Sequence, residues 1–170
     1  MRQAFTLIEM LISVVILSIM MLFLYESYAA LNKSNAFYKE KAISIKNDEL
    51  KKRILYLDFS LALHKTVRIL NQDTKEDVIY MQSSNSLHKR HNPYIAYIVN
   101  DEKLYRLESI KEFKEYPFGS DVEFEVDYMG KVDGFRVYKS SKKVGEIYLV
   151  NIKFKKEDEV LLKIKVLNEY

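Results

Sequence analysis

The chain has 170 residues, of which 30% are charged, and it carries a formal net charge of +3 without a single cysteine. This length suits one membrane-spanning helix and one compact domain, and so mild a charge does not by itself indicate a nucleic-acid or other polyanionic ligand. An exported domain without cysteine has no disulfides, so its core must hold by packing.

An apolar stretch runs from Phe5 to Tyr25 and contains one charged residue, Glu9. At about 1.5 Å of rise per residue this stretch makes a helix of roughly 31 Å, close to the thickness of the hydrocarbon core of a bilayer. A carboxylate at membrane depth costs about 2.5–3.5 kcal/mol on insertion scales and marks a functional site by default. We therefore expect a transmembrane helix over 5–25 in which another group neutralises Glu9.

The residues from Ala4 to Ser13 read Ala-Phe-Thr-Leu-Ile-Glu-Met-Leu-Ile-Ser. This segment resembles the N-terminal motif of type IV pilins and of the pseudopilins of type II secretion. The resemblance implies that a prepilin peptidase removes the leader peptide 1–4 by cutting between Ala4 and Phe5, and that Phe5 is then N-methylated. It also implies that Glu9 pairs with the terminal amine of a neighbouring subunit during assembly. The family usually has glycine before the cut, where this chain has Ala4.

The charges that flank the apolar stretch do not decide its orientation. The family resemblance implies one: the leader lies in the cytoplasm, the chain crosses the cytoplasmic (inner) membrane once, and the C-terminal domain lies outside, in the periplasm or in a pilus. It also implies the partners, which are other pilin or pseudopilin subunits, the prepilin peptidase and the inner-membrane assembly platform.

Beyond residue 25 the apolar residues keep a helical spacing, and no proline occurs before Pro93. We predict one helix from about Thr6 to about Lys65, whose amphipathic half, 26–65, packs on a sheet. The predicted packing face has steps of seven, four, three and four, and Asp58 lies largely off it. The residues of this predicted packing face are Ile43, Leu50, Ile54, Leu57 and Leu61.

The end of this helix also resembles that of J-type pseudopilins, which tends to read Leu, two residues, Asp, then Ala. The matching residues are Leu55, Asp58 and Ala62. Many major pilins close a C-terminal loop with a disulfide, which a cysteine-free chain cannot do. Both features favour a minor pilin or a minor, J-like pseudopilin.

Alternating apolar and polar residues predict a β-sheet domain over 72–170. A two-residue turn at Asp101-Glu102 would pair Val99 with Leu104, Ile98 with Tyr105 and Ala96 with Leu107. In a last hairpin, an odd-numbered loop of three or five residues centred on Asp158 would pair Phe154 with Leu162, Ile152 with Ile164 and Val150 with Val166. The predicted fold class is α+β, pilin-like: a long N-terminal α-helix packed on an antiparallel sheet with a polar outer face.

Two clusters could bind a metal ion. The acidic residues Asp121, Glu123, Glu125 and Asp127 alternate with Val122, Phe124, Val126 and Tyr128. Alternate residues of a strand are about 6.6 Å apart, too far for all four acids to share one calcium ion. His88 and His91 flank Lys89-Arg90, and His64 stands alone, which is weak evidence for zinc. A solvated strand face and an exposed basic loop are the preferred interpretations, so we expect neither metal nor cofactor.

We find no phosphate-binding loop, no Ser-His-Asp arrangement and no metalloprotease motif, and we expect no enzyme. The favoured function is a structural subunit of a type IV pilus-like filament or of a type II secretion pseudopilus. One alternative is a single-pass, membrane-anchored binding or sensor domain that never polymerises. Another is a subunit of a DNA-uptake (competence) pilus that contacts phosphates through 88–91.

Overall fold

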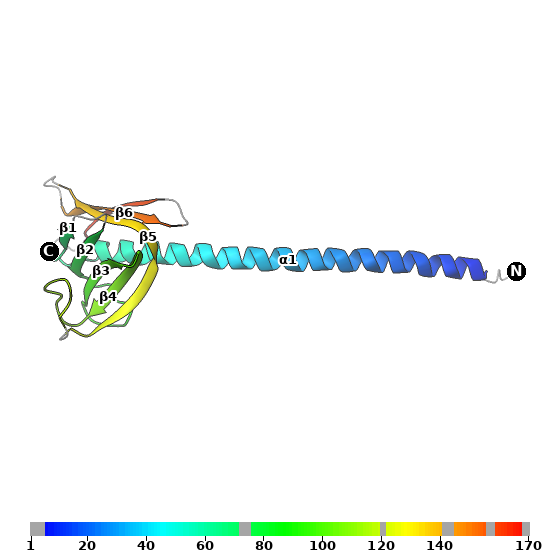
Figure 1. Cartoon of the computed structure of the whole chain (residues 1–170), viewed down its shortest axis with the longest axis horizontal. Helices are drawn as coiled ribbons and strands as arrows, with labels where there is room; N and C mark the ends of the chain where they lie inside the picture. Colours follow the sequence, from blue (N-terminus) through cyan, green and yellow to red (C-terminus); the bar gives the residue numbers. More distant parts are fainter. Residues whose placement is uncertain (1–5, 72–75, 120–121, 141–144, 156–158, 168–170) are drawn as a thin grey trace. The chain divides into compact units, whose positions relative to one another are not determined.

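The computed structural model describes residues 6–71, 76–119, 122–140, 145–155 and 159–167 of the chain. The chain divides into two compact units, with the boundary between Glu49 and Leu50. One long helix, α1, runs from Leu7 to Ser60, and the strands of a single sheet follow it in sequence (Figure 1). The fold class is therefore α+β, with a long N-terminal helix followed by an antiparallel sheet, as the sequence predicts.

Helix α1 contains 54 residues and neither glycine nor proline, so nothing in its backbone chemistry interrupts the hydrogen-bond ladder. It ends at Ser60 rather than near Lys65, five residues before the predicted end. The sheet takes over the backbone at this point. The N–H of Leu63 donates to the carbonyl oxygen of Gln82 at 2.8 Å, and Lys65 has a φ of 58°, outside the helical region.

The end of α1 packs with a different face from the predicted one. Its buried residues are Leu55, Asp58, Phe59 and Ser60, followed by Ala62 beyond the helix. Leu50 is 45% exposed, and Ile54 and Leu57 are only partly buried. Both sets have helical spacing, which explains the error, because the period alone does not choose between neighbouring stripes of one helix. Asp58, predicted to lie off the packing face, lies within it.

Within the described part of the chain, seven strands form one antiparallel sheet in sequence order. Their bounds are β1 Arg68–Asn71, β2 Asp77–Gln82, β3 Tyr94–Asn100, β4 Lys103–Ser109, β5 Phe124–Lys139, β6 Ile147–Phe154 and β7 Val160–Lys165. The sheet thus begins at β1, before residue 72. The sequence did not predict β1, because so short a strand shows no alternating pattern. The sheet curls so that β2 meets β5, where Asp77 accepts hydrogen bonds from the side chain of Arg136 and the N–H of Val137, both at 2.8 Å.

The end of α1 covers one face of the sheet, which we call the inner face. The main core lies between them and is built around Phe59, whose ring contacts those of Tyr97 and Tyr148 at 6.4 and 5.7 Å between centroids. All three side chains are fully buried. Aromatic rings of this size supply much of the apolar area that a domain of this length must bury.

The predicted register of the β3–β4 hairpin is confirmed: Val99 pairs with Leu104, Ile98 with Tyr105 and Ala96 with Leu107. Asp101 and Glu102 have φ values of 49° and 59°, and two positive φ angles are what a two-residue hairpin turn requires.

The predicted register of the last hairpin is wrong by four residues. Ile152 pairs with Val160 rather than with Ile164, and Val150 pairs with Leu162 rather than with Val166. A shift by an even number keeps every side chain on its own face, so the apolar pattern could not distinguish the two registers. The predicted loop falls partly on residues 156–158, which lie outside the described residues.

The opposite, outer face of the sheet is not polar over β2 to β5, contrary to the prediction. A second apolar cluster covers it, formed by Val78, Tyr80, Ala96, Leu107 and Phe113. Phe113 stacks on Tyr80 with 6.1 Å between ring centroids. Beyond this cover, Phe124, Val126 and Tyr128 remain 37%, 55% and 52% exposed on the same face.

Candidate assembly site

The first turn of α1 is closed by Thr6 and Glu9. The N–H of Thr6 and its Oγ1 hydroxyl both donate to Oε2 of Glu9, each at 2.9 Å. The spacing Thr-x-x-Glu is that of a capping box, in which a side chain three residues on satisfies a free backbone donor at the helix start. The carboxylate also lies at the positive end of the helix dipole. The predicted cleavage and methylation positions, Ala4 and Phe5, lie outside the described residues.

Helix α1 contains an 18-residue window that is long and apolar enough to cross a membrane. Two of its hydroxyl groups are satisfied within the helix. Ser13 donates to the carbonyl oxygen of Glu9 and Ser18 to that of Val14, each at 2.8 Å. Hydroxyls bonded in this way present little polarity to lipid, where an unsatisfied polar group costs several kcal/mol. The first half of α1 is therefore suited to a bilayer, and it fits a membrane-anchored, pilin-like chain.

A buried charged cluster lies at the other end of α1. The fully buried guanidinium of Arg106 donates from Nε to Oδ2 of Asp58 at 2.7 Å, and from Nη1 to Glu108 at 2.8 Å and to Asp127 at 3.1 Å. Asp58 also accepts from the hydroxyl of Tyr97 and from the side-chain amide of Asn85, both at 2.6 Å. The cluster therefore joins the helix end to β3, β4, β5 and the β2–β3 loop.

The pKa values follow from this burial. Burial raises the pKa of Asp58 above its usual value, against the attraction of Arg106. Burial also opposes ionisation of Arg106, but Asp58 outweighs it and raises the pKa of the guanidinium, so that Arg106 stays charged. For Glu108, the hydrogen bonds from Ser86 and Arg106 outweigh burial and lower its pKa.

Glu108 also fixes the loop that carries the histidines. Its carboxylate accepts from the hydroxyl of Ser86 at 2.6 Å and from the N–H of Leu87 at 3.0 Å. In the same loop, Nε2 of His88 lies 3.1 Å from Asp127, and Arg90 lies 3.6 Å from Glu125. The loop is therefore held against the acidic row of β5 through His88 and Arg90, whereas Lys89 and His91 are exposed.

The acidic row forms the solvated face that we expected at Glu123 and Glu125, which are exposed, but not at Asp127. Asp127 points to the inner face and belongs to the charged cluster, whereas Glu125 is exposed and Asp121 lies outside the described residues. Among the described residues, no group of three or more His, Cys, Asp or Glu side chains is placed to hold a metal ion. His64 is exposed beyond the end of α1.

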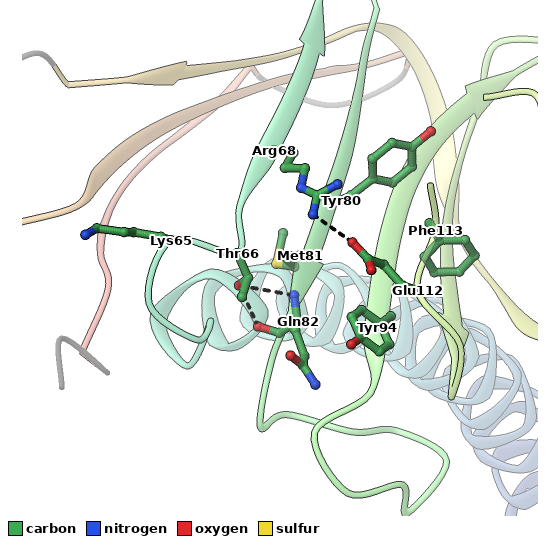
Figure 2. A pocket seen from close by; sticks show the side chains of 9 residues that line it. All are labelled: Lys65, Thr66, Arg68, Tyr80, Met81, Gln82, Tyr94, Glu112 and Phe113. Carbon is green, nitrogen blue, oxygen red and sulfur yellow. Dashed lines mark hydrogen bonds and ion pairs between the residues drawn. The ribbon is translucent and has the colours of Figure 1, made fainter. Parts of the chain in front are cut away.

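A pocket between the edge of the sheet and residues 112–113 encloses a cavity of about 160 Å³ (Figure 2). Two of its polar side chains have partners: Arg68 donates to Glu112 at 2.7 Å, and Thr66 bonds the backbone of Gln82. The buried hydroxyl of Tyr80 has no hydrogen-bond partner among the described residues. Ligand pockets usually enclose about 300–1,000 Å³. We therefore assign no chemistry to this pocket.

The sequence analysis missed Arg106 and Glu108. A signal was present, because both alternate with Leu104 on a strand whose register was predicted correctly. Two opposite charges on a core-facing row indicate a buried ion pair, and Asp58 in the J-type pattern could have supplied its third member.

A comparison with known families matches residues 1–25 to the model described as the prokaryotic N-terminal methylation motif. No curated protein and no solved structure matches the chain. The family match supports a type IV pilin-like chain that is processed as a prepilin, and it agrees with the resemblance noted from Ala4 to Ser13.

Proposed function

We propose that the chain is a structural subunit of a type IV pilus-like filament or of a type II secretion pseudopilus. The match to the N-terminal methylation motif over residues 1–25 carries this proposal, because the motif lies at the start of a long apolar helix. In this proposal the prepilin peptidase cuts between Ala4 and Phe5 and Phe5 becomes N-methylated. The subunit waits in the cytoplasmic membrane with its sheet domain outside, and the assembly platform then transfers it to the filament.

Glu9 drives assembly in this proposal. Within the subunit, Oε2 of Glu9 accepts two hydrogen bonds from Thr6, whereas Oε1 has no partner among the described residues. The carboxylate can therefore keep its capping role and still accept the terminal amine of a neighbouring subunit. Pairing neutralises two charges in an apolar setting, and losing one partner of such a pair costs about 3–5 kcal/mol.

We further propose that the subunit is a minor one, in the manner of J-type pseudopilins. Leu55, Asp58 and Ala62 support this, because all three residues of the J-type pattern are buried, at the end of α1 and just beyond it. The lack of cysteine points the same way. The DNA-contacting alternative has less support, because His88 and Arg90 already have acidic partners on β5.

Intact-mass measurement and N-terminal sequencing of the chain from its native membrane test the proposal. We expect a chain that starts at N-methylated Phe5. A chain that still starts at Met1, beside other substrates that the same peptidase has cut, would favour a membrane-anchored domain that never polymerises.

The Glu9→Ala variant tests the assembly step. We expect the variant to reach the membrane with a folded sheet domain but to be absent from sheared filaments. Glu26→Ala is the matched control, because it removes an acid from the same helix just beyond the apolar stretch. Filaments that contain Glu9→Ala as often as Glu26→Ala would contradict the role of Glu9.

A further inference from the structure

Strand β5 has an edge that no other strand occupies. Its first part pairs with β4 from Phe124 to Lys131, and its second part pairs with β6 from Val132 to Lys139. Among the described residues, no strand pairs with the remaining side of Phe124–Tyr128. We call this segment the free β5 edge. A free edge presents backbone N–H and C=O groups that can accept a further strand.

The free β5 edge lacks two of the features that usually prevent pairing. It contains no proline and no lysine, and its outward side chains are apolar and aromatic: Phe124, Val126 and Tyr128. Edge strands of monomeric proteins are usually protected by lysine, proline, bulges, short length or inward-pointing charges. Here the nearest bulge lies just beyond the segment, between Tyr128 and Gly130. The inward side chains Glu125 and Asp127 do not repel a partner strongly, since Arg90 and Arg106 lie beside them.

Strand β7 is the last strand of the sheet, and no described strand lies beyond it. Its two faces differ in chemistry. Leu162 and Ile164 face the core, whereas Leu161 and Lys163 point outward, with Leu161 59% exposed. The free β5 edge thus has acidic residues on the inner face and apolar residues on the outer face, whereas β7 has apolar residues on the inner face and both Lys163 and Leu161 on the outer face.

We propose that the free β5 edge of one subunit pairs with β7 of a second copy of the chain. Side-chain chemistry selects the arrangement. If the inner face of one sheet continues into the outer face of the next, Glu125 lies beside Lys163 and Val126 beside Leu162. The alternative, inner face to inner face, would put the carboxylate of Glu125 beside the core-facing row of β7, where its desolvation would be unfavourable.

This contact joins two different surfaces, so each copy can donate β7 to one neighbour and accept β7 from another. Contacts of this head-to-tail kind generate rings or open helical arrays rather than closed dimers. The inference rests on the proposed function, in which subunits assemble into a filament. A minor subunit that makes this contact is present as a short run of adjacent copies rather than as a single copy.

Cysteine cross-linking of the full-length chain in its native membrane tests the contact. The natural chain has no cysteine, so a Glu125→Cys, Lys163→Cys chain carries only the two introduced thiols. Under mild oxidation we expect a ladder of dimers, trimers and higher multimers. Each single-cysteine chain is a control and should stay monomeric. Dimers of the Glu125→Cys chain alone would show a symmetric contact and overturn the proposal.

Charge reversal provides the second test. We expect Glu125→Lys and Lys163→Glu each to lower the yield of the chain in sheared filaments about tenfold, since like charges then face one another across the contact. The double variant should restore the yield, because it restores the opposite charges. A double variant no better than the single ones would refute the pairing.

The two tests separate this inference from the proposed function. Filaments that contain the chain but give no ladder with the cysteine pair would overturn the β5–β7 contact and leave the filament subunit in place. Absence of both filaments and ladder would overturn both. A ladder that persists in the Glu9→Ala background would show that the sheet contact forms before extraction from the membrane.

Discussion

Replacing Arg106 by methionine removes the central cation of the buried cluster and nearly preserves the volume of the side chain. In the variant, Asp58 keeps the hydrogen bonds from Tyr97 and Asn85, and Glu108 keeps those from Ser86 and the N–H of Leu87. Both carboxylates nevertheless lose Arg106, their fully buried positive partner. The perturbation is therefore electrostatic rather than one of packing.

Removing one partner of a buried ion pair destabilises a protein by about 3–5 kcal/mol, because an uncompensated charge stays behind. Two of the carboxylates left here, Asp58 and Glu108, have fully buried side chains. We therefore expect Arg106→Met to lower the free energy of unfolding of the sheet domain by about 3–5 kcal/mol. Whole domains are stable by only about 5–15 kcal/mol, so this loss is a large fraction of the total.

The assay is urea denaturation of the full-length chain in detergent micelles, followed by near-ultraviolet circular dichroism of its tyrosines. The matched control is Arg68→Met, which removes the exposed ion pair with Glu112 from the same sheet. Exposed pairs contribute about 0–1 kcal/mol, so this control should unfold almost like the natural chain. If Arg106→Met and Arg68→Met lower the free energy of unfolding equally, the buried cluster does not hold the helix end to the sheet.

Two further predictions concern the sheet domain. Gly130 has a φ of 137°, and an added Cβ would lie 3.0 Å from the ring of Phe154. Gly130→Ala should therefore lower the free energy of unfolding by about 1–3 kcal/mol in the same assay. The control Gly134→Ala, on the same strand but without a positive φ, should lower it less. Lys139 and the N–H of Lys65 outweigh burial and lower the pKa of Glu146. Its stabilising contribution is thus complete above the ordinary carboxyl pKa and is lost as the pH falls below it. Glu146→Gln should cost about 1–2 kcal/mol at neutral pH and progressively less towards about pH 3; an equal cost at both pH values would contradict this linkage.

The sequence predicts the parts of this fold that depend on local chemistry. The apolar run from Phe5 to Tyr25, without glycine or proline, predicts a helix whatever surrounds it. The turn at Asp101-Glu102 sets the register of its hairpin, because a two-residue loop leaves no freedom in pairing. The family motif at the N-terminus can likewise be recognised from the sequence alone, because it depends on a short contiguous segment of residues.

The parts that the sequence does not predict depend on long-range choices. A shift of four residues in the last hairpin preserves both faces, so only the three-dimensional packing decides between Val160 and Ile164 as the partner of Ile152. The sequence also did not decide which face of β5 turns towards the core. Its apolar row, Phe124 to Tyr128, could have faced the core, but the inner position of Asp127 beside Arg106 turns that row outward.

The buried charges explain why one face of the helix end is used and not its neighbour. The stripe Ile54, Leu57 and Leu61 is as apolar as the stripe Leu55, Phe59 and Ala62, so hydrophobic burial alone discriminates weakly between two rotations of α1 about its own axis. Only the second stripe contains an acid, Asp58, which receives hydrogen bonds from Arg106, Tyr97 and Asn85. In the first rotation Arg106 would lose its hydrogen bonds to Asp58 and keep those to Glu108 and Asp127, and breaking a buried ion pair is destabilising. The cluster thus selects the rotation, and with it the direction in which every other residue of the helix end points.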